Sequence, residues 1–119
     1  MNLSDYESLR RFETGPKGKG SLRQKQSRFV RLVALLILFA DRGGYELTFS
    51  DAYATTGHMK GSLHYKRLAI DLNLFIDGKY LTKTSDYRVL GEYWESLGCS
   101  WGGRFTDGNH FSLEHKGVR

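Results

Sequence analysis

The chain has too few cysteines to cross-link a small fold and no apolar run long enough to cross a membrane. Its 119 residues include one cysteine, Cys99, so no internal disulfide can form, which fits folding in a reducing compartment. The longest apolar run, residues 29–40, spans 12 residues and contains Arg31, whereas a transmembrane helix needs about 20. No small-residue cleavage site follows this run, so no secretory signal is evident. We therefore expect no stable membrane span.

Acidic residues are scarce in the N-terminal part of the chain. Residues 1–31 hold eight Lys/Arg and three Asp/Glu, whereas residues 32–119 hold ten of each, so the net charge of +5 arises in the first part. Residues 14–21 contain three glycines and the only proline, which predict a flexible linker. We expect a basic, flexible extension over residues 1–24 and a single domain over residues 25–119. The arm suits an anionic envelope or nucleic acid; a solvated tail is the alternative.

Hydrophobic periodicity predicts two helices. Apolar residues at helical spacing between Phe29 and Ala40 predict a helix over residues 22–42, which Gly43-Gly44 would end. A membrane-surface helix is the alternative, but a strand pattern follows at once. A second helix is expected over residues 85–97, capped by Ser85. Its inner stripe would consist of Val89, Leu90, Tyr93, Trp94 and Leu97.

Strand patterns complete an α+β fold and place polar side chains on one face. Period-two alternation predicts strands over residues 45–50, 69–76, 79–82 and 110–114, with an Asp77-Gly78 hairpin turn. Asp71 and His110 would point away from the core. If their strands are neighbours, both emerge on one side of a small antiparallel sheet, and His64 can fold back over that side. We therefore expect helices packed on one face of the sheet and a zinc site on the other.

The chemistry of these side chains suits a metal site. Two histidines and one carboxylate can hold zinc and leave one position open for water. A second carboxylate beside that water can act as its base. Taken singly, each residue has a simpler explanation as a solvated polar group. We interpret His58 and His115 as surface residues, although His58 could line a cleft, and Cys99 as a packing residue.

The order of these residues resembles a known family. One stretch, Ser62-x-His64-x6-Asp71 with Ala69 two before the aspartate, is similar to the Ser-x-His-x-x-Gly-x-Ala-x-Asp motif of the zinc D-Ala-D-Ala carboxypeptidase and L-alanyl-D-glutamate endopeptidase family. A second stretch, Trp101-Gly102-Gly103 followed by Asp107-x-x-His110-Phe111, resembles the ending of the same family. The resemblance spans roughly residues 45–113 and is closest to small bacteriophage endolysins.

The resemblance implies a site, a cofactor and a reaction. His64, Asp71 and His110 would bind zinc, and Asp107 would be the general base. The substrate would be the peptide part of bacterial peptidoglycan, cut at the L-Ala–D-Glu bond, with D-Ala-D-Ala carboxypeptidase activity as a close variant. The protein would be a monomer, held in the host cytoplasm until lysis and acting at the cell wall.

Three further residues are expected to orient the substrate or the groups around the metal: Tyr53, Ser62 and Trp101. For Trp101, a structural role in pinning the glycine-rich loop over residues 101–109 is an equal alternative.

Two departures from the family pattern bear on activity. Arg67 stands where the motif has glycine, so the loop after His64 could take another path. Ala54 stands where the family has an arginine that steadies the oxyanion, and losing one such donor costs on the order of 100- to 1000-fold in rate. The enzyme then has a lower catalytic rate, uses another cation such as Arg67 or Lys60, or is a variant altered at that site. The alternative function is a catalytically silent module that binds cell wall or nucleic acid through the basic arm.

Overall fold

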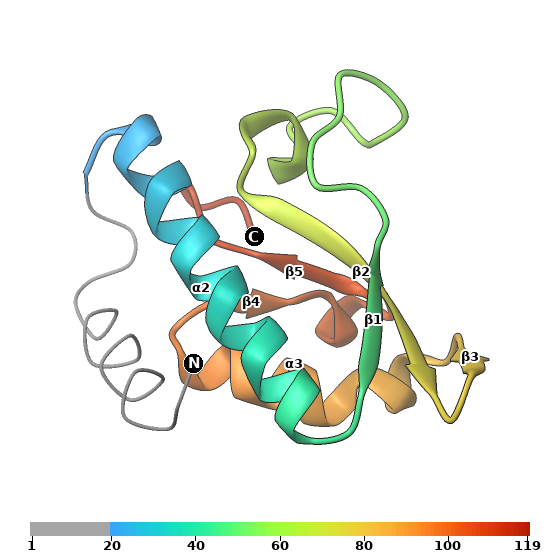
Figure 1. The fold of residues 1–119 in the computed structure, drawn as a ribbon. Coiled ribbons are helices and arrows are strands. Elements are labelled where there is room, and N and C mark those ends of the chain that lie inside the picture. The colour runs from blue at the N-terminus through green and yellow to red at the C-terminus, as the bar shows by residue number, and fades with distance from the viewer. Residues whose placement is uncertain (1–19) are drawn as a thin grey trace, which may run out of the picture.

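A computed structural model describes residues 20–119 of the chain (Figure 1). The extension predicted over residues 1–24 lies outside the described residues as far as residue 19. Its last residues, 22–24, form the first turn of helix α2 (Leu22–Arg42). Helix α2 therefore spans the predicted boundary between residues 24 and 25, and the division of the chain into an extension and a domain stays a prediction.

Helix α2 has the bounds that the periodicity predicts. At its start, the hydroxyl of Ser21 accepts a hydrogen bond from the Gln24 amide at 3.2 Å, and the Gln24 side chain accepts one from the Ser21 amide at 2.8 Å. This capping box satisfies two amides that a helix start leaves without partners. The helix ends at Arg42, and the amide of the next residue, Gly43, donates to carbonyls of the last turn. No helix within residues 20–119 combines the length and apolar character needed to span a bilayer.

A five-stranded antiparallel sheet supports the fold, and its strand order is β1-β2-β5-β4 with β3 also paired to β2. The strands are β1 (Glu46–Phe49), β2 (Ala69–Ile76), β3 (Lys79–Leu81), β4 (Ser100–Trp101) and β5 (His110–Ser112). Asp77 and Gly78 have φ angles of 52° and 77°, as the predicted tight hairpin turn requires. The predicted α+β class with a small antiparallel sheet is confirmed.

The core lies between the sheet and two helices, α2 and α3 (Arg88–Ser96), as Figure 1 shows. Trp94 of α3 has no exposed surface and packs edge-on against Phe29 of α2 and Phe111 of β5, with ring centroids 5.9 and 6.0 Å away. Its indole N–H lies 3.0 Å from the carbonyl of Ser100 and 3.1 Å from that of Ser112. One side chain thus joins both helices to β4 and β5.

The second helix begins later than predicted. A 3₁₀ turn, η2 (Thr84–Tyr87), precedes α3, and the amide of Lys83, just before this turn, donates to the carboxylate of Asp86 at 3.0 Å. Ser85, the predicted cap, lies within the turn. Placing Val89 in the inner stripe is wrong, because its side chain is 50% exposed. The buried stripe begins at Leu90 instead of Val89 and follows the spacing i, i+3, i+4, i+7. It consists of Leu90, Tyr93, Trp94 and Leu97.

Replacing Gly91 by alanine is expected to lower the free energy of unfolding by about 1–3 kcal/mol. A Cβ on Gly91 would lie 2.1 Å from the Trp101 ring, so the ring or the helix must shift. In an exposed helix the same change usually stabilises. Denaturant unfolding measures the difference, and Glu92→Ala, on the exposed side of α3, is the control with a change within about 0.5 kcal/mol. A Gly91→Ala protein as stable as wild type would contradict this packing.

Candidate metal site

The register of the sheet brings two polar side chains together. β2 and β5 are antiparallel neighbours, and Asp71 lies directly opposite His110. This confirms the predicted adjacency of the two strands. Ile70 and Leu72, on either side of Asp71, are buried, whereas Asp71 itself is partly exposed on the other face. The alternation of side chains along β2 therefore presents the carboxylate to the site.

His64 reaches the same place from a short 3₁₀ turn, η1 (Leu63–Lys66), that precedes β2. The Ser62 hydroxyl accepts a hydrogen bond from the His64 amide at 3.2 Å, which caps the turn. Arg67 ends the turn in the left-handed conformation, with φ 56° and ψ 35°. Glycine takes that conformation most easily, so Arg67 keeps the path that a glycine at this position would allow.

The three side chains converge at distances that fit a metal ion. Asp71 Oδ1 lies 3.3 Å from His64 Nε2 and 3.2 Å from His110 Nδ1. The two imidazole nitrogens lie 3.2 Å apart. Ligand atoms about 2.1 Å from one tetrahedral zinc ion lie roughly 3.4 Å from one another. The donor set and its spacing therefore fit zinc, and this His-His-Asp group could hold it.

His58 is a further residue of the site, and treating it as a surface residue missed it. Its ring stacks on that of His64, with centroids 4.0 Å apart and planes inclined by 17°. Its Nε2 lies 3.0 Å from Asp51 Oδ2. His58, His64 and Asp71 each offer a ligand atom within 4.8 Å of the others. The one sign in the sequence that His58 belongs to the site was its position six residues before His64.

The ring orientations distinguish the two possible ligand sets. A metal ion lies in the plane of each imidazole that binds it, so two nearly parallel stacked rings cannot both direct a lone pair at one ion. The rings of His64 and His110 are inclined by 67°, which allows their lone pairs to converge. This geometry favours His64, Asp71 and His110 as ligands. His58, with Asp51, then supports the position of the His64 ring.

Asp107 approaches the group from the loop before β5. One of its carboxylate oxygens lies 4.0 Å from His110 Nδ1, and its side chain is 60% exposed. The loop is tight because the Asp107 amide donates to the Gly102 carbonyl at 2.9 Å and the His110 amide donates to the Asp107 carbonyl at 3.1 Å. A Cβ on Gly102 would lie 2.3 Å from the Asp107 carbonyl oxygen, so this position needs glycine.

A pocket of about 370 Å³ opens over these side chains. Its wall includes the predicted residues His64, Asp71, Asp107 and His110, together with residues 58–63, Val118 and Arg119. Ser62 is among them, and Lys60 also lines the pocket. Arg67 is not part of this wall; its guanidinium lies over the Tyr53 ring, 4.1 Å from the centroid.

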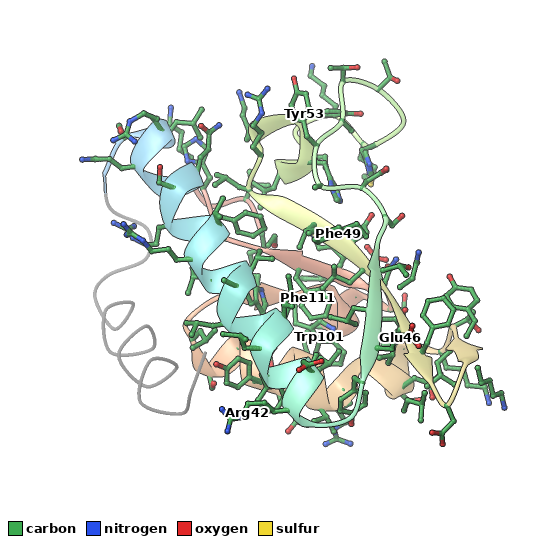
Figure 2. All side chains as sticks on the ribbon, in the orientation of Figure 1. Arg42, Glu46, Phe49, Tyr53, Trp101 and Phe111 are labelled. Carbon is green, nitrogen blue, oxygen red and sulfur yellow. The ribbon has the colours of Figure 1, made fainter. Side chains whose placement is uncertain are left out.

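The remaining predicted residues lie outside the pocket wall. Trp101 is 5% exposed, and its indole N–H donates to the Gly108 carbonyl at 2.8 Å. Figure 2 shows Trp101 inside the molecule, whereas Tyr53 stands on the loop at the top. Of the two roles considered for Trp101, its geometry supports pinning of the loop. The Ala54 amide donates to the His64 carbonyl at 3.4 Å.

Asp71 remains ionised across the neutral range. Burial alone would raise the pKa of its carboxyl, but hydrogen bonds from His110 and His64, and their positive charge when protonated, lower the pKa from 3.8 to about 2. The carboxylate is therefore available to a cation at neutral pH. Protons on the two imidazoles compete with a metal for the same atoms.

Replacing His64, Asp71 or His110 by alanine is expected to abolish stoichiometric zinc binding, because each removes one of three ligands. Replacing His58 should preserve one zinc per chain and weaken affinity by roughly 10- to 100-fold, as loss of a supporting contact does. Equilibrium dialysis with metal analysis measures both, and circular dichroism checks folding. A fully loaded His110→Ala protein, or a metal-free His58→Ala protein, would show that His58 is the ligand instead.

Acid should destabilise the metal-free protein through Asp71. Its folded pKa of about 2 lies below the ordinary 3.8, so the unfolded state binds this proton more readily. The stabilisation is full above 3.8 and is lost as the pH falls towards 2. In Asp71→Asn this part of the pH dependence should disappear. Denaturant unfolding across that window compares the two proteins, and equal slopes would show that Asp71 is not responsible.

Comparison with known proteins finds a family model that matches this region. No curated protein matches the chain. A family model described as D-alanyl-D-alanine carboxypeptidase matches residues 56–113. The matched segment contains the four converging residues His64, Asp71, Asp107 and His110, and it leaves out α2 and β1. This part of the chain is therefore similar to that family.

Proposed function

We propose that the protein is a zinc-dependent peptidase that cuts the peptide part of bacterial peptidoglycan, at the L-Ala–D-Glu bond in the manner of an endolysin. The observation that carries this proposal is the convergence of His64, Asp71 and His110 within 3.3 Å of one another, beside the exposed carboxylate of Asp107. The family model that matches residues 56–113 is described as D-alanyl-D-alanine carboxypeptidase, which supports a peptide substrate. The protein would act at the wall, after release from the host cytoplasm.

Each side chain has a role that its surroundings support. Zinc held by His64, Asp71 and His110 would supply a Lewis acid that polarises a carbonyl and makes a bound water more acidic. Asp107, which faces the pocket with an exposed carboxylate, would take a proton from water and pass it to the leaving amine. Ser62 holds the turn that carries His64, and Asp51 orients His58 against the same ring.

Digestion of purified peptidoglycan tests the reaction. The zinc-loaded protein is expected to release new L-Ala carboxyl and D-Glu amino ends, identified by mass spectrometry. A chelator should abolish these ends, and added zinc should restore them. New D-Ala carboxyl ends instead would indicate the carboxypeptidase variant. No new ends from a folded, zinc-loaded protein would contradict the peptidase and leave the alternative, a binding module that uses the basic arm.

Asp107→Asn separates the proposed base from the metal ligands. The variant should keep one zinc per chain and lose turnover by roughly 100- to 10,000-fold, because the amide cannot accept the proton. Asp77→Asn, at an exposed carboxylate of the β2–β3 turn that is not part of the pocket wall, is the matched control and should keep wild-type turnover. Full activity in Asp107→Asn would assign the base to another residue.

A further inference from the structure

Two cationic side chains of the described residues line the metal pocket in addition to the proposed metal ligands and base. Lys60 and Arg119 both belong to its wall and are exposed. Within residues 20–119 neither forms an ion pair with a carboxylate. Arg104, by contrast, is held by both carboxylate oxygens of Glu95 at 2.9 and 2.7 Å. The pocket therefore combines the proposed metal ligands with cations that can meet an anionic group of a substrate.

A short hairpin brings Arg119 to the pocket. His115 and Val118 exchange both backbone hydrogen bonds, at 3.0 and 2.9 Å. Between them Lys116 and Gly117 have φ angles of 49° and 81°, the pair of left-handed residues that closes a tight two-residue turn. Val118 itself lines the pocket, so the residue that follows it is placed on the rim.

The hairpin is also fixed to helix α2, which corrects the interpretation of His115 as a solvated residue. His115 is half-buried, and its Nδ1 lies 3.1 Å from the Nζ of Lys25, a side chain that is 6% exposed. Burial and the charges of Lys25, Lys116 and Lys66 lower the pKa of His115, so the neutral ring accepts the hydrogen bond that Lys25 donates. Arg119 thus extends from a segment anchored at its base.

The other cations near the site are directed elsewhere. Arg67 lies over the Tyr53 ring, outside the pocket wall. Position 54, where an arginine would stand by resemblance, is alanine and is also outside the wall. Within the part of the chain that the structure describes, the Lys and Arg residues of the pocket wall are Arg119 and Lys60.

We propose that Arg119, assisted by Lys60, determines specificity by binding a carboxylate of the substrate at the rim of the metal pocket. The inference rests on the proposed peptidase function. A guanidinium matches a carboxylate with two parallel hydrogen bonds, and a lysine adds a point charge. The substrate class is a peptide with a free carboxylate next to the cleaved amide, as in a muropeptide whose D-Glu α-carboxyl is free rather than amidated.

A pair of muropeptides that differ only at this carboxyl tests the proposal. Zinc-loaded wild type should cleave the free acid with a KM lower than that of the amide by roughly 10- to 100-fold, the range of a charge-assisted hydrogen bond. Arg119→Ala should raise the KM for the free acid most of the way to that of the amide and leave kcat and the amide's KM nearly unchanged. Arg119→Lys and Lys60→Ala should lie between.

Lys116→Ala is the matched control, because it removes a lysine of the same hairpin that does not line the pocket. It should keep the wild-type discrimination, and zinc content and circular dichroism should be unchanged in every variant. Arg119→Ala with wild-type discrimination would overturn the proposal.

Binding of the two muropeptides, measured by calorimetry, separates this inference from the peptidase function. If wild type cleaves neither fragment, the proposed function fails. A preference for the free acid that Arg119→Ala loses would still support the carboxylate site. Equal affinity of wild type for acid and amide would overturn it.

Discussion

Asp71 on β2 and His110 on β5 face each other across an antiparallel strand pair, and the carboxylate and imidazole lie 3.2 Å apart. The other parts of the site are placed relative to this pair. His64 reaches it from the turn that leads into β2, and Asp107 from the loop that leads into β5. Because side chains alternate along a strand, a slip of one residue in the register would turn Asp71 towards the core. The sheet register is therefore the constraint that the candidate site requires.

The core on the opposite face maintains that register. Phe111, the residue after His110, is fully buried against Trp94, whose indole binds the backbone of both β4 and β5. Close contacts at glycines then shape the loop between these strands. Gly91 and Gly103 flank the Trp101 ring, and a Cβ on either would lie within 2.3 Å of it. The loop that carries Asp107 is consequently supported by the tightly packed Trp101 ring.

The sequence was sufficient for the features that depend on periodicity and turn chemistry. The alternation in residues 69–76 predicted the exposed side of Asp71, and Asp77-Gly78 predicted the hairpin, because both signals are local. Features that depend on the path of a loop or on contacts between distant segments were not accessible in this way. The stacking of His58 on His64 and the bond between Lys25 and His115, 90 residues apart, follow from the path of loops. The start of α3 was missed because the local sequence does not distinguish the 3₁₀ turn over residues 84–87 from the first turn of an α-helix.

Arg67 adopts an unfavourable backbone conformation, and its side chain orders a neighbouring loop. A non-glycine residue in the left-handed conformation costs on the order of 1 kcal/mol, and here it follows directly after the turn that holds His64. In return its guanidinium covers Tyr53, in the loop between Asp51 and His58. A glycine at this position would let the turn form more readily but would remove the contact between the guanidinium and the Tyr53 ring. The loop bearing the Asp51–His58 pair would then sample more conformations, and the pocket wall it provides would become less uniform from molecule to molecule.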